Sequence, residues 1–305
     1  EARMEIKPGI GTTFYGKLPA ILNPDIVAEC DIVCLHTALD SSDPETVEQV
    51  RKLNPCAQIW IGFPANYLSR MDLFQNRKKV LAEVDRIAAV ALDCGADVLE
   101  PNGEGSSDGK VVGDWVGPMG DALEAARLEE LGKAVMERFK DRLQGKMALG
   151  WTSHDGTGFR IPRNVLKNVD LHSPQHYPAY AKHVVNQREL DRRFQWSKGQ
   201  WDHLAARGIV SPDVCPYGSK HSPYLQGWGH SVGALVWGLC EAPTARMWAC
   251  PGSWSPEALE ALKLARKLRA KHGHGPNAIE KFQAASGLDD DGIVGRLTLE
   301  ALRKL

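Results

Sequence analysis

The chain has 305 residues, enough for one large hydrophobic core or for one large domain with a small second one. Hydrophobic residues make up 43% of it and charged residues 25%, as in an ordinary globular protein. The formal net charge of -1 excludes a general nucleic-acid binder, because such proteins carry a clear basic excess. No apolar run reaches the roughly 18 residues that would indicate a membrane span, so no membrane partner is expected.

Short apolar runs recur along the chain, and helix-like segments separate most of them. The runs have the length of buried strands and are bounded by turn residues. The predicted strands are residues 8–14, 31–37, 58–63, 96–100, 146–151, 169–173, 208–214 and 244–249.

Long segments between these strands have apolar residues at three- and four-residue spacing, which predicts amphipathic helices. These segments are residues 76–95, 120–145, 186–208 and 255–273. Another helix is predicted to begin at Asp43-Pro44-Glu45, where Asp43 is a favourable N-cap and Pro44 suits the first helical position.

Alternating strands and helices predict an α/β fold with a parallel sheet. Eight such repeats favour a (β/α)8 TIM barrel as the catalytic domain, residues 1–273. An open doubly wound sheet is the alternative, but no glycine-rich dinucleotide fingerprint follows a strand. Active sites of TIM barrels lie at the carboxyl ends of the strands, so the residues there are the candidates for chemistry.

The seven cysteines are scattered, mostly within apolar stretches, and none forms a CxxC pair. We interpret them as reduced core residues made in a reducing compartment rather than as zinc ligands. No signal peptide is visible from Met4 onward.

The end of the chain has a recognisable pattern of apolar, glycine and turn residues. Its members are Ile279, Phe282, Gln283, Gly287, Leu288, the run Asp291-Gly292-Ile293-Val294-Gly295, Thr298 and Leu302. This pattern resembles the second half of the peptidoglycan-binding domain family, found at the ends of bacterial and phage wall-degrading enzymes. The resemblance implies a small helical module, residues 274–305, whose partner is peptidoglycan.

The module of that family is longer and has an earlier helix and turn. Here residues 257–271 are the candidate for the missing helix, so that module and barrel would share a boundary. The alternative is a remnant of the module that only packs on the barrel.

Residues 95–105, GADVLEPNGEG, place Glu100 at the end of the fourth predicted strand and Glu104 in the glycine-rich stretch after it. Strand alternation turns Asp97 and Glu100 to opposite faces. A carboxyl group partly removed from water at a barrel mouth is suited to general acid catalysis. The stretch resembles the fourth-strand region of barrel glycosidases, where a catalytic glutamate follows an asparagine. Here Asn102 comes after Glu100, so the predicted proton donor is either Glu100 or Glu104, and an ion-paired structural glutamate is the alternative.

Glycoside hydrolysis usually needs a second carboxylate as base or nucleophile. Asp155, which follows the fifth strand, is a predicted catalytic residue. Asp40, after the second strand, and Asp213, near the end of the seventh, stay open for the same role, although aspartates are also common in turns. The DxE pair of the barrel muramidases and the DxxDxDxE run of the chitinases are both absent from the fourth-strand region.

Aromatic and polar side chains at the strand ends are predicted to line a glycan groove, because aromatic faces stack on sugar rings. Glutamine and tyrosine at this depth resemble the residues with which glycosidases hold an N-acetyl sugar. The predicted substrate-binding residues are His36, Trp60, Asn102, Trp151, Gln175, His176, Tyr177 and Trp248. Any single tryptophan among them is equally at home in a core.

Cleavage of amide bonds in the wall generally relies on zinc held by histidines or on a cysteine nucleophile. Histidines lie at several predicted strand ends, namely His36, His154, His172 and His176. Because these strand-end histidines have no HxH or HExxH spacing, neither a metal nor a cofactor is predicted.

These features together predict a monomeric peptidoglycan hydrolase, a muramidase-like endolysin or autolysin that cleaves the glycan strand by general acid catalysis. A zinc-dependent amidase or peptidase of the cell wall and a non-catalytic wall-binding protein are the alternatives. Since no export leader is visible, we expect a phage endolysin that waits in the host cytoplasm before it acts on the wall.

Overall fold

The computed structural model describes residues 6–15, 22–36, 43–64, 76–102, 122–154, 169–176, 209–210, 213–214, 232–240, 243–249, 256–275 and 277–305. The chain forms two compact units. The first contains Cys34–Pro174, and the second contains Lys7–Val33 together with Gln175–Leu305.

The first unit is built on strands that hydrogen-bond in the order β2-β3-β4-β5, with β6 also pairing with β5. The strands are β2 (Ile32–His36), β3 (Gln58–Pro64), β4 (Val98–Asn102), β5 (Ala148–His154) and β6 (Leu171–His176). The pairs β3–β4 and β4–β5 are parallel. The chain passes between the units within β2 and again within β6.

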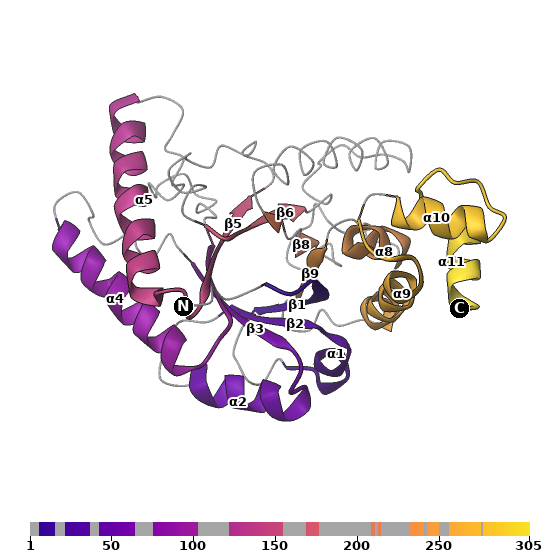
Figure 1. Ribbon diagram of the computed structural model, residues 1–305, viewed down its shortest axis with the longest axis horizontal. Helices are drawn as coiled ribbons and strands as arrows, with labels where there is room; N and C mark the ends of the chain where they lie inside the picture. The colour runs from indigo at the N-terminus through magenta and orange to yellow at the C-terminus, as the bar shows by residue number, and fades with distance from the viewer. Residues whose placement is uncertain are drawn as a thin grey trace, which may run out of the picture. The chain divides into compact units, whose positions relative to one another are not determined.

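Helices α2 (Asp43–Leu53), α4 (Arg77–Asp93) and α5 (Ala122–Leu143) follow β2, β3 and β4 in the chain. Figure 1 shows them on the outer side of this unit's strands. The buried stripe of α4 is Val80, Val84, Ile87, Ala88 and Ala91, at the three- and four-residue spacing of a helix with one face in the core.

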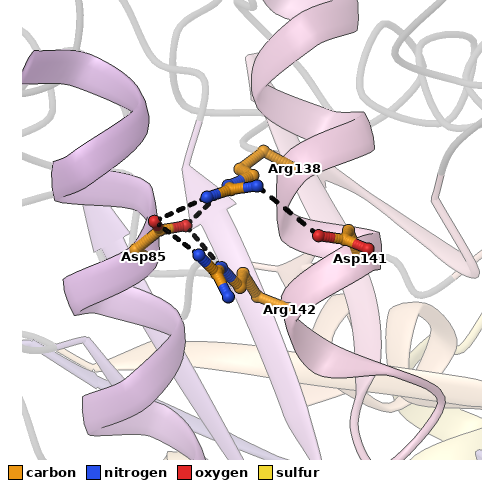
Figure 2. Close-up of polar contacts among 4 residues, drawn as sticks. All are labelled: Asp85, Arg138, Asp141 and Arg142. Atoms are coloured by element: carbon orange, nitrogen blue, oxygen red, sulfur yellow. Dashed lines mark hydrogen bonds and ion pairs between the residues drawn. The ribbon is translucent and has the colours of Figure 1, made fainter. Parts of the chain in front are cut away.

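A carboxylate on α4 joins that helix to α5. Asp85 accepts two hydrogen bonds from Arg138, at 2.7 and 2.8 Å, and two from Arg142, at 2.7 and 2.9 Å. Figure 2 shows the carboxylate between the two guanidinium groups, with Asp141 on the far side of Arg138. The hydrogen bonds from Arg142 and Arg138 hold the pKa of Asp85 well below its ordinary value.

Three aspartates make the same pair of hydrogen bonds to the preceding strand. Asp31, Asp97 and Asp170 come directly before β2, β4 and β6. Each carboxylate accepts from one backbone N–H near the start of β1, β3 or β5, at 3.0, 2.7 and 3.0 Å. Each aspartate's own N–H donates at 2.7 Å to the carbonyl of the same partner, which is Ile10, Ile59 or Leu149 in turn. This repeat ties the amino ends of successive strands together.

The second unit contains strands paired in the order β1-β9-β8-β6-β7. Its further elements are β1 (Gly9–Tyr15), α1 (Pro24–Glu29), β7 (Ile209–Val210), β8 (Asp213–Val214), α8 (Val232–Cys240), β9 (Thr244–Ala249), α9 (Pro256–His272), α10 (Ala278–Ala285) and α11 (Arg296–Arg303). The pairs β1–β9, β9–β8 and β8–β6 are parallel.

The C-terminal helices α10 and α11 contact α8 and α9. Phe282 and Leu302 are almost fully buried, with exposed fractions of 1% and 0%. The buried Gln283 amide donates to Asp291 Oδ1 and to the Ile293 carbonyl, both at 2.9 Å, and accepts from the Gly292 N–H. The predicted boundary at residues 273 and 274 falls within the second unit, and a separate module there stays a prediction.

The observed strands overlap all eight predicted ones and form a parallel α/β arrangement. The seventh predicted strand corresponds to β7 and β8, with residues 211 and 212 outside the described part. The predicted helix 186–208 also lies outside it. Helices α1 and α8 were not predicted from the sequence. No helix in the described ranges is long and apolar enough to cross a bilayer.

Candidate active site

The repeat formed by Asp31, Asp97 and Asp170 places three buried residues at equivalent positions on β2, β4 and β6. Cys34, Glu100 and Ser173 each follow their aspartate by three positions. Their exposed fractions are 1%, 2% and 0%. In barrels of alternating strands and helices, side chains from alternate strands share one interior layer. We therefore expect these three side chains to belong to one layer of the first unit.

Glu100 lies two residues before the carboxyl end of β4, between two glycines on the neighbouring strands. Its register partner on β3 is Gly62. On β5, Ala148 pairs with Val98 and Thr152 pairs with Asn102. Glu100 lies midway between Val98 and Asn102, so its register position on β5 is Gly150.

A thiol reaches the Glu100 carboxyl from a strand that is not its neighbour. Cys34 Sγ on β2 donates to Glu100 Oε2 on β4 at 3.9 Å, although β3 lies between these two strands. Gly62, on the intervening strand β3, has no side chain. A Cβ atom at this position would lie 3.6 Å from Cys34 Sγ and 3.2 Å from His36 Cδ2.

The strand on the other side of Glu100 also leaves room for its side chain. A Cβ atom at Gly150 would lie 3.2 Å from Glu100 Cγ and 3.5 Å from Glu100 Oε1. Contacts of 3.2 Å are tighter than a side chain normally tolerates, so the Glu100 side chain occupies space that only glycine leaves open.

This arrangement holds one carboxyl group at a defined place near the carboxyl end of a strand. A carboxyl group fixed near the carboxyl end of a barrel strand is in the place where a general acid gives its proton to a leaving group. The arrangement therefore offers proton transfer at Glu100.

The other predicted site residues of the first unit differ in how they relate to Glu100. His36 is 7% exposed and shares a face of β2 with Cys34, so it lies beside the Glu100 region. Trp60 shares the face of Gly62 but is 0% exposed. Trp151 is 2% exposed, and alternation puts it on the face of β5 opposite to Gly150. Asn102 ends β4, where only its backbone is described. The substrate-binding roles of these residues stay predictions.

Several predicted residues lie in the second unit or outside the described part. Gln175 and His176 pair in backbone register with Asp213 and Val214, and Trp248 pairs with Thr13. The side chains of Gln175, His176, Asp213 and Trp248 are not described. The predicted residues outside the described ranges are Asp40, Glu104, Asp155 and Tyr177.

In the described part of the chain, no group of three or more His, Cys, Asp or Glu residues is placed to hold a metal ion. Of the four strand-end histidines, only His36 has a described side chain.

Sequence reasoning missed the neighbours of Glu100. It treated Cys34 as a core residue and gave Gly62 and Gly150 no role. The signal that was available is the repeat of an aspartate before an apolar strand. Counting three residues from Asp31 and Asp97 aligns Cys34 with Glu100.

No model of a known protein family matches the sequence, and no curated protein matches it either. Solved structures do match in fold. The chain is similar to a GH18 chitinase from Pseudoalteromonas aurantia, with 11% identity, a TM-score of 0.55, and coverage of 84% of this chain and 99% of that one. It is also similar to a chitinase from Rhizomucor miehei, with 13% identity, a TM-score of 0.54, and coverage of 84% and 99%.

A glycoside hydrolase family 5 enzyme from Prevotella bryantii B14 is a third similar structure, with 13% identity, a TM-score of 0.55, and coverage of 84% and 95%. These likenesses show a fold of the TIM-barrel type, in agreement with the predicted fold class.

Proposed function

We propose that the chain is a peptidoglycan hydrolase of the muramidase type, which cleaves the glycan strand with Glu100 as the proton donor. The observation that carries this proposal is the placement of Glu100. It is 2% exposed and near the carboxyl end of β4, with Gly62 as its register partner on β3 and with its side chain packed against Gly150 of β5. A carboxyl that served only as a surface ion pair would need neither the burial nor the two glycines.

The fold supports the choice of glycan as substrate. The similar structures are described as chitinases and as a glycoside hydrolase family 5 enzyme. The DxxDxDxE run of the chitinases is absent here, which argues against chitin chemistry of that type. Peptidoglycan is the proposed glycan because residues 278–305 resemble half of a peptidoglycan-binding domain.

In the proposed reaction, the Glu100 carboxyl gives its proton to the glycosidic oxygen as the bond to the sugar carbon breaks. A second carboxylate, for which Asp155 is the leading candidate, acts as nucleophile or activates a water molecule. Carboxyl separations of about 5 Å would indicate retention of configuration, and about 6.5–9.5 Å inversion. We further propose that the protein is stored in the host cytoplasm and acts as an endolysin.

Initial rates of peptidoglycan digestion by Glu100→Gln and Glu104→Gln test the proposal. Glutamine keeps the shape of the side chain but has no proton to give, so Glu100→Gln is expected to lower the rate at least about 10²–10⁴-fold. Glu104→Gln is the matched control and is expected to stay near wild type. Both variants should still sediment with purified walls.

A Glu100→Gln chain of near wild-type activity would contradict the assignment. Loss of wild-type activity on adding a chelator would instead favour the zinc amidase or peptidase.

A further inference from the structure

We infer that Cys34 and Gly150 are positioning residues that set the orientation of the Glu100 carboxyl group. The Cys34 thiol holds Oε2, and Gly150, which has no side chain, leaves the space that the Oε1 side of the carboxyl group occupies. This inference rests on the proposed function, since it assigns roles around the same acid.

The two contacts fall on different oxygens of one carboxyl group. Cys34 Sγ lies 3.9 Å from Oε2. The position of a Gly150 Cβ atom would be 3.5 Å from Oε1 and 3.4 Å from the Glu100 Cβ. The thiol on β2 and the glycine on β5 therefore act on opposite sides of the same side chain, and together they constrain its rotation.

The contact between the Cys34 thiol and the Glu100 carboxyl group crosses an intervening strand. Neighbouring strands lie about 4.8 Å apart, so β2 and β4 are too far apart for backbone contact. Cys34 reaches Glu100 across Gly62, where a Cβ atom would lie 3.6 Å from Cys34 Sγ and 3.2 Å from His36 Cδ2. Cys34, Gly62 and Gly150 thus belong to one arrangement around Glu100.

The thiol contact acts on the orientation of the carboxyl group. A thiol is a weak donor, and its hydrogen bond holds Oε2 at one place. Loss of the donor frees the carboxyl to rotate away from the reacting oxygen, which lowers kcat but leaves substrate binding, and therefore KM, unchanged.

The experiment compares purified full-length wild type with Cys34→Ala, Cys34→Ser and Gly150→Ala. Cys94→Ala is the matched control, because Cys94 is another buried thiol of the first unit. The measurements are kcat and KM on purified peptidoglycan over a range of pH, together with thermal unfolding of each variant.

Cys34→Ala is expected to lower kcat about 3–10-fold with KM unchanged, as for loss of one hydrogen bond. Cys34→Ser keeps a donor and is expected to recover part of the rate. Gly150→Ala displaces the Glu100 side chain by a few tenths of an ångström, and kcat is expected to fall about tenfold.

A Cys34→Ala enzyme with the kcat and KM of Cys94→Ala would overturn the role of the thiol, as would a serine variant no better than alanine. If Cys34→Ala does not fold, Gly150→Ala decides, and a wild-type kcat for it overturns the inference. Absence of any glycan cleavage by the wild type would instead overturn the proposed function, so the two failures are distinguishable.

Discussion

The two ends of β4 carry carboxylates of opposite character. Asp97, just before the strand, is partly exposed, accepts from the Ile59 N–H at 2.7 Å and belongs to a repeat that also includes Asp31 and Asp170. Glu100, three residues later, is 2% exposed and accepts a hydrogen bond from the Cys34 thiol. The amino-end aspartate is tied to main-chain geometry that three pairs of strands share. The glutamate instead packs beside Cys34 and Gly150, which are particular to this site. The proposed function leads us to expect this difference, because one end of a barrel stabilises the fold and the other carries the chemistry.

Shortening the glutamate is expected to have the largest effect. Glu100→Asp keeps a carboxyl group but withdraws it by one methylene group. A misplacement of about 1 Å costs roughly 10²-fold in rate, so peptidoglycan digestion should fall by that factor while thermal unfolding stays the same. An aspartate enzyme with full activity would show that the position of the carboxyl is unimportant.

Removing the Asp97 carboxylate should have the opposite effect, with a lower stability and an unchanged activity. In Asp97→Ala the Ile59 N–H loses its charged acceptor, and we expect the free energy of unfolding to fall by about 1.5–3 kcal/mol. Activity per folded molecule should stay within about twofold of wild type, because no step of the chemistry uses this end. Denaturant unfolding checks the expected loss of stability, and digestion rates measured on the same preparation check the expected activity. Asp170→Ala, which removes the equivalent bond to Leu149, should behave alike.

Asp85, the carboxylate between α4 and α5, extends the comparison. It stabilises the fold although it lies at neither end of a strand. Asp85→Asn is expected to lower the free energy of unfolding by about 1 kcal/mol at neutral pH, because the cluster is partly exposed and solvent screens it. The pKa of Asp85 is lowered in the folded chain, so its contribution is present above the unfolded value of about 4 and is lost as the pH falls below it. Urea unfolding of wild type and variant at neutral pH and at acid pH measures this. A difference that grows toward acid pH would contradict the assigned ion pairs.

The strands were predictable because each is a short apolar run bounded by polar residues, as in Ile32–His36 and Val98–Asn102. Helix α8, Val232–Cys240, was missed because its sequence VGALVWGLC has no polar face, so its pattern lacks the period of a surface helix. Helix α1 has only six residues, too few for a period to stand out.

Glu100 was predictable as a carboxyl at a strand end, but its surroundings were not. The contact with Cys34 joins residues 66 positions apart and crosses an intervening strand. Such a contact depends on the register of three strands, and no local pattern gives that register. The positions of Gly62 and Gly150 beside Glu100 were unpredictable for the same reason, because they too depend on the register between neighbouring strands.

The central claim is tested most directly by mass spectrometry of the fragments that the wild-type protein releases from purified peptidoglycan, with Glu100→Gln as the blank. The account predicts soluble fragments with new reducing sugar ends and intact stem peptides, absent from the Glu100→Gln digest. Intact glycan strands with released peptides or new free amino groups would contradict it, because the bond cut would then be an amide and Glu100 would not be protonating a glycosidic oxygen.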